Sequence, residues 1–135
     1  NVSNVIAERC TFSIDCREES DERLATFLTD MQVVIQHFEN VTVKRTLHVP
    51  ATPLSQALRK QNAEIATRMN FPFQELFSGA GHDSQIMSTV APTAMIFVPS
   101  EAGISHAPTE YTKMSDLLYG VALLAASLSA QVNEA

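Results

Sequence analysis

Residues 78–106 constrain the fold and chemistry of this chain more than any other stretch. The segment contains a Gly79-Ala80-Gly81 turn that runs into His82, an apolar β-branched run over Thr93–Val98, and a final Gly-Ile-Ser-His that ends at His106. A short apolar run of this kind is typical of a strand buried on both faces. Because loops that follow buried strands carry ligands in α/β proteins, we expect both histidines to lie at the ends of rigid elements.

The first third of the chain has the pattern of a β-α-β unit. Residues 10–17 alternate between one apolar face and one polar face, which predicts a half-buried strand. Ser20, followed by two acidic residues, predicts the N-cap of a helix that extends to about Glu39, since apolar residues recur there every three or four positions. Residues 41–49 alternate again and predict a second strand.

The remainder begins with a helix and then mixes short strands and helices. Thr52-Pro53 is typical of an N-cap and a first helical residue, which predicts a helix over Leu54–Met69 and a domain boundary near residues 50–53. Asp83 and Ser115 are the expected caps of two later helices. The elements expected after the first helix are, in order, a strand, a short helix, a buried strand and a long helix: Gln74–Phe77, Ser84–Val90, Thr93–Val98 and Asp116–Val132.

Charge and hydropathy argue against two classes of partner. The 135 residues carry 9 basic and 15 acidic side chains, a net charge of −6. Because the basic residues are scattered, we expect no nucleic-acid partner and no anionic membrane surface. The longest apolar stretch, Tyr119–Leu128, is much shorter than the ~20 residues of a membrane span. Residues 1–4 lack a charged region before an apolar core and an initiator Met, so we expect an internal segment without a signal peptide.

The two cysteines favour a reducing compartment. Cys10 and Cys16 lie on one predicted strand, which places them roughly 20 Å apart at ~3.3 Å per residue. A disulfide needs Cα atoms within about 7 Å. The two residues therefore cannot pair while the strand is formed, and we expect a cytoplasmic protein.

Several linked motifs resemble one known family. They are SGAGHDSQ at residues 78–85, PTAMIFVPS at residues 92–100, and the Gly-Ile-Ser-His followed by Pro108 and Glu110. Together they resemble the amidohydrolase branch of the M20 metallopeptidase-like enzymes, which contains allantoate amidohydrolase, N-carbamoyl-L-amino-acid hydrolase and β-ureidopropionase. The resemblance covers essentially all of this chain but only the last third or so of such an enzyme.

The resemblance implies an α/β (α+β) fold shared between two domains. Residues 1–53 would form half of a ferredoxin-like lid and dimerisation domain, and residues 54–135 the C-terminal segment of a metal-dependent catalytic α/β domain. In the ferredoxin-like topology the two strands of this β-α-β unit flank a strand from the other half. Without that strand, backbone groups stay unpaired, so we expect the chain to be ordered only with another chain, by strand exchange, or within a longer polypeptide.

The implied activity is hydrolysis of a ureido (carbamoyl) C–N bond in a small carboxylated substrate such as allantoate or an N-carbamoyl amino acid. A dinuclear site with two divalent metal ions, zinc or manganese, would activate the water. The resemblance also implies a homodimer or association with the N-terminal part of the same enzyme. The other metal ligands and the general-base Glu lie in N-terminal segments of the family, so the chain alone is expected to be inactive.

The resemblance assigns roles to both histidines. His106 corresponds to the metal-binding histidine of the C-terminal part. His82 corresponds to a catalytic histidine close to the substrate that helps to polarise the ureido carbonyl. Gly79 and Gly81 would let backbone amides approach an anionic substrate group. The simpler interpretations are a hydrogen-bonded loop histidine for His106 and a tight strand-to-helix connection for the glycine turn.

A substrate clamp is implied for two residues near the start of the chain. Asn4-Val5-Ile6 resembles the family's Asn-Val-Ile-Pro-Gly segment, and Arg17 ends a strand that resembles its Asp-x-Arg strand. Arginine offers a planar fork to a carboxylate, and the Asn4 amide can bond either end of a ureido acid. Ala7-Glu8 replaces Pro-Gly, so the turn at Asn4 differs from the family pattern. The simpler interpretation is a surface Arg17 paired with a neighbouring acidic residue, Asp15 or Glu18.

Two other functions stay open on the sequence. The chain is alternatively a non-catalytic interaction or dimerisation module with this fold and no metal. It is also compatible with an aminoacylase- or dipeptidase-like relative that cleaves peptide bonds. Metal content and a substrate panel that compares ureido with peptide bonds distinguish the three.

Overall fold

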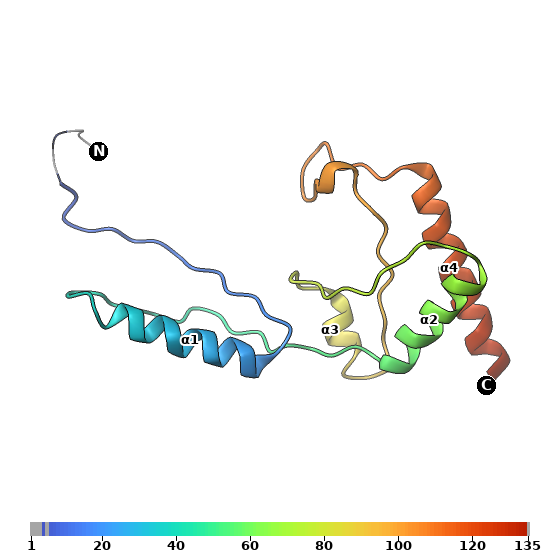
Figure 1. The fold of residues 1–135 in the computed structure, drawn as a ribbon, viewed down its shortest axis with the longest axis horizontal. Helices are drawn as coiled ribbons and strands as arrows, with labels where there is room; N and C mark the ends of the chain where they lie inside the picture. Colours follow the sequence, from blue (N-terminus) through green and yellow to red (C-terminus); the bar gives the residue numbers. More distant parts are fainter. Residues whose placement is uncertain (1–3, 5, 135) are drawn as a thin grey trace. The chain divides into compact units, whose positions relative to one another are not determined.

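The structure is a computed structural model that describes residues 4 and 6–134. Its contacts divide the chain into two compact units, Asn1–Ala51 and Thr52–Ala135. Unit 1 contains helix α1 (Asp21–Ile35), and unit 2 contains the other helices, which are α2 (Gln56–Arg68), α3 (Asp83–Met87), the short 3₁₀ helix η1 (Glu101–Gly103) and α4 (Met114–Glu134) (Figure 1). The division lies between Ala51 and Thr52, within the range of residues 50–53 where the sequence predicts a domain boundary. The assignment of the units to two domains of a longer enzyme stays a prediction.

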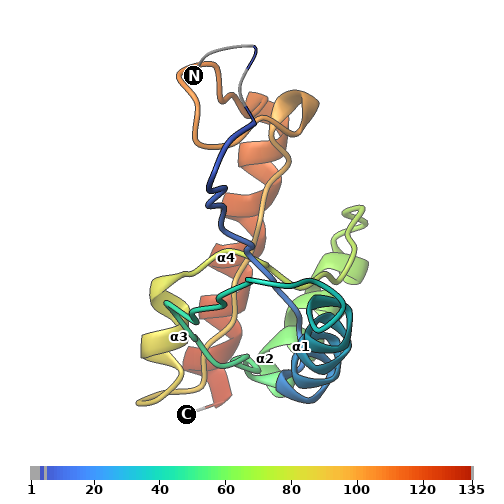
Figure 2. The same ribbon diagram turned by 90° about the vertical axis from the view of Figure 1, so that its left-hand side faces the viewer.

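The predicted strands are not formed in the part of the chain that the structure describes. Residues 6–19, before α1 in the sequence, and residues 41–50, after it, run as chain without strand arrows (Figures 1 and 2). Their apolar side chains face solvent, with Phe12 and Leu47 each 77% exposed. A strand requires a partner for its backbone N–H and C=O groups. The ferredoxin-like topology, which supplies that partner from other residues, stays a prediction.

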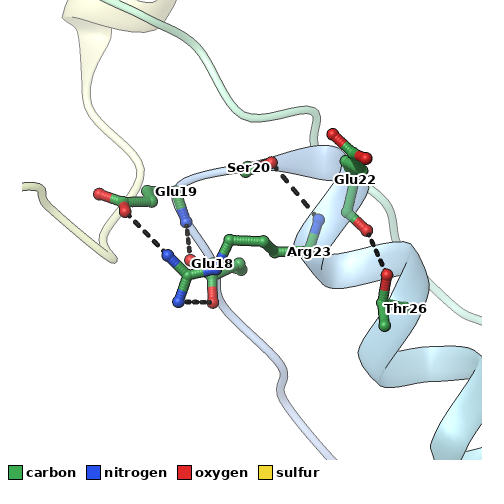
Figure 3. Close-up of polar contacts among 6 residues, drawn as sticks. All are labelled: Glu18, Glu19, Ser20, Glu22, Arg23 and Thr26. Atoms are coloured by element: carbon green, nitrogen blue, oxygen red, sulfur yellow. Dashed lines mark hydrogen bonds and ion pairs between the residues drawn. The ribbon is translucent and has the colours of Figure 1, made fainter.

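Helix α1 begins where the sequence predicts. The Ser20 hydroxyl accepts a hydrogen bond from the Arg23 backbone N–H at 3.4 Å, which confirms the predicted N-cap. The Arg23 guanidinium also forms ion pairs with Glu18 at 3.2 Å and Glu19 at 3.1 Å, and these contacts fix the approach to the helix (Figure 3). The helix ends at Ile35, earlier than the predicted Glu39, because the chain turns and reaches a left-handed residue at Asn40 (φ 60°).

Helices α2 and α4 begin at other residues than predicted. Ser55, not Thr52, caps α2, since its hydroxyl accepts from the Leu58 N–H at 3.3 Å. Helix α4 begins at Met114, so Ser115 lies inside it and is not the cap. The first turn of α4 closes on the Lys113 carbonyl, which accepts hydrogen bonds from two amides of the helix at 3.0 and 3.1 Å.

The core of unit 2 lies between α2 and α4. Ile65 and Ala66 of α2 are 3% and 1% exposed. Two polar contacts join the helices: Ser127 Oγ donates to Asn62 Oδ1 at 2.7 Å, and Gln131 Nε2 donates to Gln61 Oε1 at 2.6 Å. Just after α2, the Phe71 ring lies 4.6 Å from the Tyr119 ring of α4, measured between centroids. These contacts occupy one side of α4.

The segment predicted as a buried strand, Thr93–Val98, passes against α4 without forming a strand. Thr93–Ile96 are half-buried, whereas Phe97 is 48% exposed. The segment anchors the start of α2, because the Thr93 carbonyl accepts from the Ser55 N–H at 2.9 Å. It also approaches α4 closely at Gly120, where an added Cβ would lie 2.5 Å from Val98 Cγ1.

The rest of α4 is apolar and uncovered. The stretch Met114–Val132 has a mean hydropathy of 1.3, which is sufficient by length and composition to cross a membrane. The apolar part of this helix is therefore longer than the stretch Tyr119–Leu128 identified from the sequence. The same composition occurs in core helices of large soluble proteins. The exposed large apolar residues of α4 are Met114, Leu117, Leu118, Tyr119, Val121, Leu124, Leu128 and Val132.

We predict that Gly120→Ala destabilises the protein. Alanine raises helix propensity by about 1 kcal/mol relative to glycine. However, the new methyl group would overlap the stiff β-branched Val98, and overpacking costs about 1–3 kcal/mol. Thermal unfolding followed by circular dichroism should show a lower Tm for this variant.

The matched control is Ser129→Ala on the exposed side of the same helix, where the hydroxyl only contacts the Ala125 carbonyl. It should change stability by less than about 0.5 kcal/mol. A Tm for Gly120→Ala at or above that of the control would contradict the close approach of Val98.

Candidate functional site

His82 sits at the junction of the glycine turn and α3. It is the N-cap residue of the helix, with extended backbone angles (φ −138°, ψ 152°). The predicted cap, Asp83, is instead the first helical residue, because the backbone N–H of His82 already reaches the Gln85 side-chain oxygen at 3.4 Å. The structure thus makes the histidine the residue that turns the chain into the helix.

Two side chains hold the His82 ring. Its Nε2 lies 2.8 Å from Ser78 Oγ, and its ring packs edge-on against Phe97 with centroids 5.6 Å apart and an interplanar angle of 65°. Ser78 and His82 are both half-buried. Neither contact was predicted, although the four-residue spacing of Ser78 and His82 across Gly-Ala-Gly is the signal that brings the two side chains together.

Neither the backbone conformation nor the packing at position 81 requires a glycine. Among the described residues Gly103 is the glycine with a positive φ. A Cβ on Gly81 would lie 3.5 Å from Gln85 Oε1, an ordinary contact distance. Gly79 and Gly81 are both exposed. The exposed turn leaves room for a substrate group to approach the backbone. That approach stays a prediction.

His106 lies in a loop whose two ends are tied together. The Glu101 N–H donates to the Tyr111 carbonyl at 2.8 Å, and the Ser100 hydroxyl donates to the Ile104 carbonyl inside the loop. His106 itself has a left-handed backbone (φ 56°), which is uncommon for a residue other than glycine. The Glu110 carboxylate accepts a hydrogen bond from the His106 backbone N–H at 2.8 Å and so supports this conformation.

Arg17 is paired with its neighbour in unit 1. Its Nη2 lies 2.6 Å from Asp15 Oδ2, and its Nε lies 3.1 Å from both oxygens of that carboxylate. The hydrogen bond to Arg17 lowers the pKa of Asp15 and raises that of Arg17. This pairing is the one that the simpler interpretation expects. Asn4 lies in an exposed turn, and Val5 of the same predicted motif lies outside the described residues.

The predicted site residues are divided between the units. Unit 1 contains Asn4 and Arg17, and unit 2 contains His82, His106 and the glycine turn. Residues 4 and 6–134 contain no cluster of three or more His, Cys, Asp or Glu side chains that could hold a metal ion. A groove on α2, which Arg59 and Glu75 line, contains none of the predicted site residues.

Comparison with known proteins places the chain in a family of hydrolases. The model of "Peptidase family M20/M25/M40" matches residues 5–130, and the chain belongs to this family. The match extends across both units of the structure. Metal dependence is general in the family.

Named relatives indicate a narrower group. The chain is 36% identical over 129 residues to the allantoate amidohydrolase of Bacillus subtilis (strain 168), an alignment that covers 92% of this chain and 31% of that protein. It is 35% identical over 133 residues to the allantoate amidohydrolase of Escherichia coli (strain K12), with coverages of 95% and 32%. An N-carbamoyl-L-amino-acid amidohydrolase of Paenarthrobacter aurescens is 29% identical over 122 residues, with coverages of 87% and 30%. The chain thus spans about a third of the length of these relatives.

We predict a measurable pKa difference for Asp15. Because the Arg17 guanidinium stabilises the carboxylate form, the pKa of Asp15 lies below its ordinary value of about 3.9. Any stability from this pair is present above that ordinary value and is lost as the pH falls through the lowered pKa. In Arg17→Gln the pKa should return toward the ordinary value.

The measurement is a carbon NMR titration of the Asp15 side-chain carboxyl. Arg23→Gln, which removes ion pairs with Glu18 and Glu19, serves as the control and should leave the Asp15 titration unchanged. An unchanged Asp15 titration in Arg17→Gln would show that the two side chains do not pair in solution.

Proposed function

We propose that the complete protein that contains this chain hydrolyses a ureido (carbamoyl) C–N bond in a small carboxylated substrate. Allantoate is the first choice and N-carbamoyl amino acids are the second. The observation that carries the proposal is the alignment of more than nine tenths of this chain with two allantoate amidohydrolases. The identities of 36% and 35% exceed the 29% to the N-carbamoyl-amino-acid enzyme, which sets the order of the two substrates.

His106 is the proposed metal ligand of this chain. A neutral imidazole is a common ligand of zinc and related metals, and among the described residues the His106 ring makes no hydrogen bond of its own. The side chain is exposed at the tip of a loop that is closed at its base. One histidine supplies only part of a catalytic site, which needs at least three protein ligands. The remaining ligands of the proposed dinuclear zinc or manganese site would come from other segments of the enzyme.

His82 is the proposed catalytic residue that contacts the substrate. Phe97 and Ser78 hold its ring, while the open glycine turn beside it leaves backbone amides accessible. An oriented imidazole next to backbone donors suits a carbonyl whose oxygen gains negative charge during hydrolysis. When bound, the metal supplies an activated water for attack on that carbonyl.

Arg17 and Asn4 are the proposed clamp for the carboxylate end of the substrate. The pairing of Arg17 with Asp15 shows that the guanidinium can hold a carboxylate with two nitrogens. A substrate carboxylate would exchange with Asp15, whose own oxygens remain exposed to solvent. In the proposed lid and dimerisation domain, this clamp would close on the substrate.

The fold and the assembly are part of the same proposal. Residues 1–53 would complete a ferredoxin-like lid domain, and residues 54–135 would complete the catalytic α/β domain. The exposed apolar side chains of the segments around α1 and of the uncovered side of α4 support an assembly with further strands and helices. We propose a cytoplasmic homodimer in which these surfaces are buried.

The family name suggests peptide-bond hydrolysis as a second activity to test. The matching model describes peptidases. An aminoacylase- or dipeptidase-like enzyme would use the same histidines on a peptide or acyl-amide bond. The substrate panel below therefore includes such bonds.

The first test measures turnover of allantoate, an N-carbamoyl amino acid and a dipeptide by the complete metal-loaded protein. We expect turnover of at least one ureido substrate and none of the dipeptide. His82→Ala and His106→Ala should each lower kcat/KM by at least about 100-fold, the scale of a lost electrostatic or acid–base group.

His37→Ala is the matched control for these two variants. The His37 ring is exposed and contacts only the Val33 carbonyl one helical turn earlier. It should retain turnover. Cleavage of the dipeptide without cleavage of ureido substrates would reject the proposed bond, and normal turnover by His106→Ala would reject the proposed ligand.

The second test concerns the support of His106. Because Glu110 holds the strained backbone of a proposed ligand, Glu110→Ala should weaken metal binding by about 10- to 100-fold. Glu110→Gln keeps a side-chain oxygen for the same amide and should retain most of the affinity. Competition with a metal-binding dye measures both, and equal affinities for all three proteins would contradict the role of the carboxylate.

A further inference from the structure

We propose that Ser100 is a positioning residue that holds the loop of His106 in the conformation that presents its imidazole to a metal ion. The role of His106 as a ligand rests on the proposed function. Ser100 lies six positions before His106 and is half-buried, whereas His106 is exposed.

The backbone of this loop adopts an uncommon conformation. Three residues within five positions are left-handed: Ala102 (φ 55°), Gly103 (φ 68°) and His106 (φ 56°). Glycine adopts this conformation freely, whereas alanine and histidine do so uncommonly. Such residues persist where surrounding contacts hold them, and they are frequent at functional sites. The loop therefore needs contacts that keep it in this conformation.

The hydroxyl of Ser100 supplies such a contact. Ser100 is the N-cap residue of η1, a position where a serine side chain usually accepts a hydrogen bond from a helix amide. In η1, which lies wholly within the described residues, the Ser100 side chain makes no such bond. Its hydroxyl instead donates to the Ile104 carbonyl, and it lies 3.4 Å from the Tyr111 carbonyl at the far end of the loop. Because a carbonyl oxygen can only accept, the hydroxyl is the donor in both contacts.

Ser100 thereby joins the two sides of the loop at its base. Its own carbonyl accepts from the Gly103 N–H at 3.0 Å, and the amide that follows it, that of Glu101, donates to the Tyr111 carbonyl at 2.8 Å. The Ile104 carbonyl that its hydroxyl holds lies two residues before His106. Loss of the hydroxyl removes the donor of this carbonyl, so the backbone that leads into His106 gains freedom.

Glu110 holds the same histidine from the other side. Its carboxylate accepts from the His106 N–H at 2.8 Å, and its own N–H donates to the Ala107 carbonyl at 2.9 Å. Ser100 thus fixes the chain before His106, and Glu110 fixes the histidine and the chain after it. A ligand residue whose backbone is already fixed loses less freedom when it binds, which raises affinity.

The test compares Ser100→Ala with Ser100→Thr in the complete protein. After removal of metal, hydrogen–deuterium exchange of residues 100–111 should be about 3- to 10-fold faster in Ser100→Ala than in the unmodified protein, the effect of one lost hydrogen bond. The affinity for Zn²⁺, measured by competition with a metal-binding dye, should fall by a similar factor. Ser100→Thr keeps the hydroxyl and should restore both values.

Ser88→Ala is the matched control. Ser88 is also half-buried, and its hydroxyl also donates to a backbone carbonyl, that of Gln85 at 2.9 Å. Because each alanine variant loses one bond of this kind, general destabilisation would affect both alike. We expect Ser88→Ala to leave the exchange of residues 100–111 and the Zn²⁺ affinity unchanged.

Two results would overturn the inference: unchanged exchange of residues 100–111 in Ser100→Ala, or faster exchange with unchanged Zn²⁺ affinity. Failure of the proposed function gives a different result, because His106→Ala would then bind Zn²⁺ as tightly as the unmodified protein. The exchange measurement uses metal-free protein, so it reports the contacts of Ser100 in either case.

Discussion

Apolar surface that the chain cannot bury by itself constrains every other feature of the structure. Ile65 and Ala66 are the buried apolar residues of the described part, while α4 and the segments around α1 expose most of their large side chains. Burial of apolar surface is the main favourable contribution to folding. Units with this much exposure gain little from their own contacts, and we propose that another chain or further segments of a longer polypeptide cover them. The match to about a third of each named relative agrees with this proposal.

The same constraint explains why some local contacts are well formed. Helix caps and closed turns depend on residues that are close in sequence, and they form without any cover. Ser20 caps α1, and the loop that contains His106 closes on its own hydrogen bonds. The ring of His82 is likewise held by Ser78, which is four residues away. The parts of the proposed site that this chain builds alone are therefore the short-range ones.

Prediction from the sequence succeeded where short-range chemistry decides the outcome. The start of α1, the end of α2 near Asn70 and the family itself could be read from side-chain patterns. The sequence could not predict that Ser55, and not Thr52, caps α2. This choice depends on the contact of Ser55 with Thr93, which lies in a distant segment. The strands at residues 10–17 and 41–49 remain untested, since their pairing partners are not provided by the described residues. The contacts of Ser78 and Phe97 with the His82 ring could not be predicted, because they form only in the folded turn.

We propose that residues 10–17, residues 41–49 and the uncovered side of α4 are buried by the rest of one enzyme. Hydrogen–deuterium exchange of the complete protein, compared with the 135-residue chain, tests it directly. We predict that residues 10–17, residues 41–49 and α4 become strongly protected in the complete protein. Equal and rapid exchange of these segments in both would contradict it.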